Sequence, residues 1–220
     1  AWDTNNEHMI SELNRNLVVR FTDYTTNEPF LSFLGTNKTD DTALTLFEYA
    51  ATNCLPPYLK LIPEISVKEM DPQKFKIEED RDNFDYIYDI LKLASFAGRE
   101  FSHRRTILNK FKREHAESNL AALDLKDLAV RRSILKMVQI WEKNKLDQGK
   151  MPGADRELES INRLCKTANT HNLLISGVFD SKQMLAFSID EILQKGQAIC
   201  HFWKADTRHG RISEFLFQKK

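Results

Sequence analysis

The chain has 220 residues, 41% apolar and 29% charged, which is typical of a folded globular protein. Its 32 lysine and arginine residues balance 32 aspartate and glutamate residues, which argues against a protein that coats DNA with a uniformly basic surface. The start is polar and no apolar run is long enough for a membrane helix, so we expect no stable membrane insertion and a cytoplasmic location.

The first part of the chain predicts two strands and a helix. Residues 17–21 and 29–34 are short apolar runs of the kind that form strands. Apolar residues between 43 and 54 then recur at helical spacing, Thr39 or Asp40 can cap this helix, and a proline pair ends it. Two further elements are predicted after it, a strand and a short helix: residues 58–62 and the segment that begins at Pro63.

The middle of the chain changes from acidic to basic. Residues 74–89 are strand-like, with aromatic side chains alternating through acidic ones. Residues 99–115 form the most basic segment, and as a helix they would place apolar and cationic side chains on different faces. This segment could bind phosphates, including an RNA backbone, or it could be a solvated helix that packs against the acidic stretch. The candidate phosphate-binding residues are Arg104, Arg105, Asn109, Lys110 and Arg113.

The second half predicts a regular series of elements. A strand is followed by two helices, and then by three strands that are joined by short turns and so form an antiparallel meander. A final helix begins near residue 212. In chain order the predicted elements are residues 120–123, 127–145, 155–169, 173–179, 183–189, 197–204 and 212–217. This order predicts a mixed α/β fold of the α+β class, in which mostly antiparallel sheets are flanked by helices.

The end of the third meander strand is a candidate site, because sites often lie where strands end. His201 or Asp206 could move a proton, and Lys204 could contact a phosphate or carboxylate group. Strand alternation predicts that Cys200, Phe202 and Lys204 share one face, with His201 and Trp203 on the other. Alternatively, His201 and Trp203 serve only in packing.

The loop at residues 207–211 precedes the last predicted helix. Coenzyme A-dependent acyltransferases hold a pyrophosphate at this position with a glycine-rich turn. Only Gly210 fits that pattern, so we expect no tight binding of acetyl-coenzyme A. The sequence also lacks Walker A, GxGxxG, HExxH and CxxC motifs, and its histidines have no metal-ligand spacing. We therefore expect no cofactor and no metal.

Several segments together resemble the phosphatidylglycerol lysyltransferase C-terminal family. They are residues 86–94, 98–99 and 104–111, then Trp141, Glu157, and residues 202–206. The segments occur in the family's order, and the resemblance covers essentially the whole chain. At Trp203, however, the family usually has an acidic residue.

The resemblance implies two tandem acetyltransferase-like units of the GNAT type, at residues 1–116 and 117–220, with the second unit incomplete at its C-terminal end. Relatives of this kind, including the Fem-type transferases, move an amino acid from aminoacyl-tRNA to an acceptor. The expected function is thus an aminoacyl- or acyl-transferase with tRNA or another polyanion as partner. The alternative is a binding module that has kept the fold without the chemistry.

Overall fold

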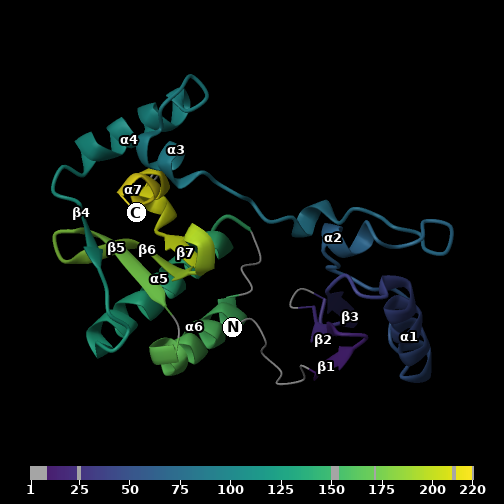
Figure 1. Ribbon diagram of the computed structural model, residues 1–220. Coiled ribbons are helices and arrows are strands. Elements are labelled where there is room, and N and C mark those ends of the chain that lie inside the picture. Colours follow the sequence, from purple (N-terminus) through teal and green to yellow (C-terminus); the bar gives the residue numbers. More distant parts are fainter. Residues whose placement is uncertain (1–8, 24–25, 150–153, 171, 210–211, 220) are drawn as a thin grey trace. The chain divides into compact units, whose positions relative to one another are not determined.

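The computed structural model describes residues 9–23, 26–149, 154–170, 172–209 and 212–219 (Figure 1). The chain forms two compact units, residues 2–86 and residues 87–220. The basic helix predicted at residues 99–115 therefore belongs to the C-terminal unit. The division into acetyltransferase-like units at residues 116 and 117 stays a prediction. No helix among the described residues is both long and apolar enough to cross a bilayer.

The N-terminal unit is built on a three-stranded antiparallel sheet. The strands are β1 (Met9–Leu13), β2 (Asn16–Thr22) and β3 (Pro29–Leu34), in the order β1-β2-β3. Helix α1 (Thr39–Thr52) covers the sheet, and the short helix α2 (Glu64–Val67) follows. The apolar faces of the sheet and of α1 meet in one core, formed by Val18, Leu31, Phe33, Ala43, Leu46 and Ala50.

Three expectations for this unit were wrong. Lys38, in the left-handed region at φ 41°, stands at the N-cap of α1, while Asp40 instead accepts a hydrogen bond from the backbone of Asp71. The strand predicted at 58–62 is reduced to one bridge between Leu31 and Leu59, because prolines flank it and Leu61 has φ 59°. Residues 74–89 form only the short 3-10 helix η1 (Arg81–Asn83), since no neighbouring strand pairs with them among the described residues.

The C-terminal unit contains a four-stranded antiparallel sheet of order β4-β5-β6-β7. Its strands are β4 (Asn119–Ala122), β5 (Leu173–Asp180), β6 (Gln183–Ile192) and β7 (Ala198–Ala205). The predicted meander is confirmed. The helices are α3 (Ile90–Ser95), α4 (Ser102–Glu114), α5 (Leu128–Leu146), α6 (Ala154–Thr167) and α7 (Ile212–Lys219). Three 3-10 turns lie between these elements: η2 (Ala168–Thr170), η3 (Gln194–Gly196) and η4 (Thr207–His209).

This sheet has a hydrophobic core on each face (Figure 1). Helices α5 and α6 cover one face, where Ile134, Met137, Ile161 and Phe187 are among the buried side chains. Helices α3, α4 and α7 cover the other, whose buried side chains include Phe96, Leu108, Phe111, Val178, Ile212 and Phe215. Because helices cover both faces of the sheet, seven successive residues of β6, from 184 to 190, are buried rather than alternately exposed.

A β-bulge interrupts β7 beside β6. Ile189 pairs with Phe202, but Asp190 pairs with Cys200, so His201 is the extra residue. Phe202 packs in the core under α5 and α6, whereas Trp203 packs on the opposite face against Phe217 of α7. The alternation predicted for Phe202 and Trp203 is therefore confirmed, and the bulge lies just before it.

Candidate functional site

Asp206 lies directly after β7, and its side chain is completely buried. Its carboxylate accepts hydrogen bonds from Asn144 Nδ2 of α5 at 2.9 Å and from the Arg208 backbone N–H at 3.1 Å. The Arg208 guanidinium donates to it through Nε at 3.0 Å and Nη2 at 2.7 Å. Burial opposes ionisation of this carboxyl, but the hydrogen bonds from Arg208 and Asn144 outweigh burial and hold the pKa of Asp206 below its usual value. Asp206 is thus an ionised anchor for the turn that follows β7.

His201, at the bulge, forms a pair with a carboxylate on the neighbouring strand. Its Nε2 lies 2.7 Å from Oε2 of Glu191, and both side chains keep about a fifth of their surface exposed, 20% and 24%. A carboxylate in this position orients the imidazole ring. His201 is therefore better placed to accept a proton than Asp206, whose carboxylate already accepts hydrogen bonds from Asn144 and Arg208.

Lys204 makes a compact group with two side chains from the covering helices. Its Nζ donates to Oε1 of Glu157 at 2.9 Å, is in ion-pair contact with Oε2 at 2.8 Å, and lies 3.9 Å above the ring of Trp141. Lys204 and Glu157 are only 13% and 14% exposed. Glu157 satisfies the ammonium charge internally, so a phosphate would have to compete with a buried ion pair. These three residues each support the family resemblance, and the structure brings them together.

Helix α4 carries the other predicted phosphate-binding residues, which differ in how they are held. Arg105 donates through Nη1 to the carbonyl oxygens of Phe96 and Gly98, at 2.5 and 2.6 Å, and so closes the loop before the helix. Lys110 is exposed, 3.5 Å from Glu114 on the same helix. Other exposed residues of α4 line an open surface depression: Thr106, Asn109, Lys112 and Arg113. Arg104 is half-buried.

The predicted residues do not form a single site. Helix α4 packs on the face of the sheet that α7 covers, whereas Lys204 contacts α5 and α6 on the opposite face. His201 lies at the bulge of β7 and Asp206 directly follows the strand. His201 contacts Glu191, whereas Asp206 is bonded to Asn144. The α4 residues and the β7 residues thus serve separate surfaces of the C-terminal unit.

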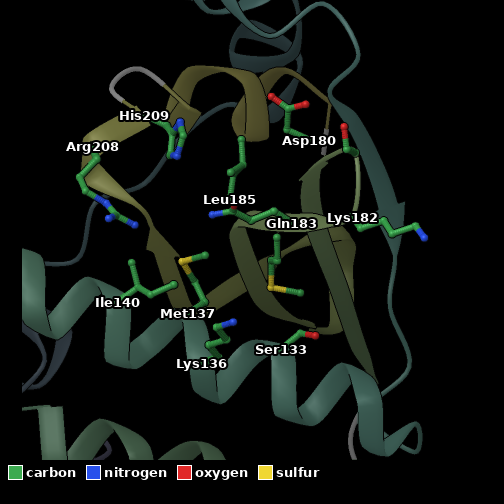
Figure 2. A pocket seen from close by; sticks show the side chains of 12 residues that line it. Ser133, Lys136, Met137, Ile140, Asp180, Lys182, Gln183, Leu185, Arg208 and His209 are labelled. Atoms are coloured by element: carbon green, nitrogen blue, oxygen red, sulfur yellow. The ribbon is translucent and has the colours of Figure 1, made fainter.

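A pocket of ≈ 810 Å³, which was not predicted from the sequence, opens beside the turn after β7 (Figure 2). Four segments form it: one face of α5, the β5–β6 turn, the first residues of β6, and the η4 turn. Its lining residues are Ser133, Lys136, Met137, Ile140, Asp180, Ser181, Lys182, Gln183, Met184, Leu185, Arg208 and His209. Four of the twelve are apolar, Met137, Ile140, Met184 and Leu185, and the other eight are polar or charged.

Two histidines and two aspartates meet at the edge of this pocket. His115, just after α4, has Nδ1 2.7 Å from Oδ2 of Asp180, and its ring stacks on Phe111 at a centroid distance of 4.7 Å. The ring of His209 stands edge-on to that of His115 at 5.3 Å, and its Nε2 lies 3.8 Å from Asp206. The sequence did not predict this group, because its members are far apart in the chain. Only the position of the β5–β6 hairpin beside the end of α4 brings them together.

The chemistry of the region is that of charged and aromatic side chains. Among the described residues, no group of three or more histidine, cysteine, aspartate or glutamate side chains is arranged to hold a metal ion. The thiols do not form a common site either, since Cys165 is buried in the core under α5 and α6 while Cys54 and Cys200 are exposed.

Comparisons with known proteins agree on the family and the fold. The sequence model of the family described as phosphatidylglycerol lysyltransferase, C-terminal, matches residues 1–219. A conserved protein of unknown function from Bacteroides thetaiotaomicron has a similar structure, with a TM-score of 0.78, 18% identity, and coverage of 99% of this chain and 73% of that one. The C-terminal domain of a predicted lysylphosphatidylglycerol synthetase from Agrobacterium fabrum is also similar, with a TM-score of 0.56, 10% identity, and coverage of 100% and 68%. No curated protein matches the sequence.

Proposed function

Because the chain belongs to the phosphatidylglycerol lysyltransferase C-terminal family, we propose that it is an aminoacyl- or acyl-transferase that takes its donor group from an aminoacyl-tRNA. The observation that carries the proposal is the match of the family's sequence model from residue 1 to residue 219. The similar fold of the Agrobacterium domain supports the same class of protein.

The proposed chemistry needs no protein nucleophile. The acceptor amine or hydroxyl attacks the carbonyl carbon of the aminoacyl ester, the ester C–O bond breaks, and the tRNA leaves with its terminal hydroxyl. The acceptor loses one proton to a base, and the departing oxygen gains one. His201 is our candidate for the base, with Glu191 orienting its ring at 2.7 Å. Asp206, the other candidate in the sequence, serves better as the anchor of the turn after β7.

The donor RNA is assigned to the exposed surface of α4. Asn109, Lys110 and Arg113 are exposed on this helix, and Lys112 lies between them with its Nζ bonded to Gln218 of α7 at 2.7 Å. An exposed row of cations attracts a phosphate backbone through release of its counterions, without sequence specificity. Arg105 is not available in the same way, because its guanidinium holds two backbone carbonyls.

A second candidate function is a binding module that does not catalyse transfer. It is favoured by the buried contacts of Lys204 with Glu157 and of Asp206 with Asn144 and Arg208, because both predicted groups already have internal partners. Such a module would keep the RNA-binding surface of α4 without any transfer activity.

Titration of the chain with aminoacyl-tRNA at several salt concentrations tests the proposal. We expect the logarithm of affinity to fall linearly with the logarithm of salt concentration, with a slope of about 0.7 to 0.9 per phosphate contact. The double variant Lys110→Glu/Arg113→Glu should bind more weakly and give a shallower slope. The matched control is Lys143→Glu/Lys166→Glu, the same charge change at exposed positions of α5 and α6.

Loss of binding in both double variants would mean that only net charge matters, and no binding at low salt would remove the RNA part of the proposal. Release of the amino acid to an amine acceptor, followed with a labelled aminoacyl-tRNA, separates the two candidate functions. A transferase should lose most of this activity in His201→Gln and keep its RNA affinity. Tight RNA binding with no transfer to a panel of amine and hydroxyl acceptors would favour the binding module.

A further inference from the structure

The pocket in Figure 2 lies outside the proposed RNA surface and away from Lys204 and His201. Its floor is apolar, formed by Met137 and Ile140 of α5 together with Met184 and Leu185 of β6. Methionine side chains adapt to the shape of what they contact, so a floor of this kind accepts an apolar body without demanding one outline. The volume of ≈ 810 Å³ falls in the range of small-molecule sites.

We propose that this pocket binds a small organic anion, whose phosphate or carboxylate group is held by Arg208 and whose apolar body lies on the methionine-lined floor. The proposal concerns binding alone. It requires neither RNA binding nor transfer activity, and it stands on a different part of the C-terminal unit.

The first support is the way in which Asp206 fixes Arg208. The buried carboxylate takes the Nε and Nη2 edge of the guanidinium, at 3.0 and 2.7 Å. The Nη1 group has no partner among the described residues, and the Arg208 side chain is 63% exposed. One edge of the fork is therefore locked by a buried ion pair, which leaves the other edge free to meet an anion. A donor that is held in place before binding loses less conformational entropy when the ligand arrives.

The second support is the balance of charge around the pocket. Its lining contains three cations, Lys136, Lys182 and Arg208, and one carboxylate, Asp180, while the buried carboxylate of Asp206 is a second negative charge beside the pocket. That carboxylate is already 2.7 Å from His115 Nδ1. Lys136 and Lys182 are exposed and have no acidic partner within the part of the chain that the structure describes. The three cations come from three different segments, α5, the β5–β6 turn and the η4 turn, so they are not a run in the sequence; in Figure 2 the Lys182 side chain extends to the side away from Arg208.

Calorimetric titration with phenyl phosphate, with inorganic phosphate as the comparison ligand, tests the proposal on the whole chain. Phenyl phosphate should bind about tenfold more tightly than inorganic phosphate, because only the aromatic ester can use the apolar floor. Arg208→Lys keeps the charge and loses the planar fork, and it should weaken phenyl phosphate about tenfold. Lys143→Ala removes a positive charge from α5 outside the pocket and should leave the affinity unchanged.

The variant Asp206→Asn gives a test of opposite sign. Loss of a negative charge beside the pocket would by itself strengthen the binding of an anion. If Asp206 acts by fixing Arg208, the variant should instead bind phenyl phosphate several-fold more weakly. A thermal melt establishes whether this variant is folded. If it is not, Arg208→Lys still tests the proposal, because the Arg208 side chain is exposed and its substitution should not disturb the fold.

Three results would overturn the proposal. One is equal affinity for phenyl phosphate and inorganic phosphate, because the floor would then take no part. Another is an equal loss in Arg208→Lys and Lys143→Ala, which would show attraction to net charge only. The third is the absence of any heat or chemical-shift change with phenyl phosphate at millimolar concentration.

Discussion

Two sets of cations in the C-terminal unit are held in different ways: those of α4, which were predicted to bind phosphate, and those near the end of β7, of which only Lys204 was. On α4, Lys110 and Arg113 are exposed, and Lys110 has only Glu114 at 3.5 Å as an ionic neighbour. At the end of β7, Lys204 is 13% exposed against Glu157 and Trp141, and Arg208 is locked on a carboxylate with no exposed surface. The first set is free to meet a polyanion. The second is part of the packing that supports the end of the strand.

The comparison shows that the type of a residue does not decide its role. An exposed ion pair contributes little to folding, because water screens the charges and the side chains lose entropy when they pair. A buried pair is costly to break, because removal of one partner leaves an uncompensated charge without water. Substitutions at Lys204 and Asp206 should therefore change the stability of the fold, while those on α4 should change RNA binding.

The largest effect is expected at Asp206, where Asp206→Asn should lower the free energy of unfolding at pH 7 by roughly 3 kcal/mol, because hydrogen bonds to a charged group contribute about 1.5 to 3 kcal/mol each. The variant removes the charge that Arg208 and Asn144 satisfy, while the shape of the side chain is kept. Urea denaturation of both proteins measures this difference. A loss below about 0.5 kcal/mol would show that Asp206 does not stabilise the turn after β7. The contacts at the end of β7 would then contribute no more to stability than the exposed residues of α4 do.

The same pair of proteins has an expected pH dependence. The pKa of Asp206 is lower in the folded protein than its ordinary value of 3.8, since Arg208 and Asn144 outweigh the effect of burial. Its contribution to stability is therefore complete above about pH 4 and is lost as the pH falls through the folded-state pKa. The stability difference between the native protein and Asp206→Asn should be constant from pH 7 to pH 5 and shrink below pH 4. A difference that shrinks between pH 7 and pH 5 would assign the effect to a histidine instead.

A smaller loss is expected at the Lys204 pair, which keeps a little exposure to water. Lys204→Met should destabilise the fold by about 2 kcal/mol, because it leaves the Glu157 carboxylate in a nearly buried position without its cation. The double variant Lys204→Met/Glu157→Leu should be more stable than Lys204→Met alone, since no unpaired charge remains. Urea denaturation of the native protein, of the single variants Lys204→Met and Glu157→Leu, and of the double variant measures both effects. If the double variant loses the sum of the two single losses, the residues are not coupled and the pair is not a unit.

The sequence was sufficient to predict the C-terminal sheet and four of its covering helices, α4, α5, α6 and α7, but not α3. The meander was predictable because its strands are consecutive and its turns are short, so that pairing is local. The strand predicted at 58–62 failed for a reason that is also local, a positive φ at Leu61 between prolines, but such a conformation cannot be inferred from alternation alone. The family was also predicted from the sequence, because the segments that resemble it occur along the chain in the family's order.

The candidate site was predicted only in part, because sites depend on contacts between distant segments. Lys204, Glu157 and Trp141 could each be identified from the sequence. Their contact with one another could not be predicted, because it depends on how α5 and α6 lie on the sheet. The pocket beside η4 was missed for the same reason. His115 and Asp180 are 65 residues apart, and neither belongs to a recognisable motif.

The smallest effect on stability, and the sharpest test of the comparison, lies within α4 itself. Arg105 and Lys110 are on the same helix and were predicted to have the same role, but Arg105 donates to the carbonyls of Phe96 and Gly98 while Lys110 is exposed. Arg105→Ala should lower the free energy of unfolding by about 1 kcal/mol, the net value of such hydrogen bonds, and Lys110→Ala should change it by less than about 0.5 kcal/mol. RNA affinity should show the reverse order, because only the lysine is free to reach a phosphate. Urea denaturation of the two variants measures which one loses more stability, and RNA titration measures which one loses more RNA affinity. Equal stability losses, or a larger loss of RNA affinity in Arg105→Ala than in Lys110→Ala, would mean that the contacts of a cation in the folded chain do not separate structural from binding roles on this helix.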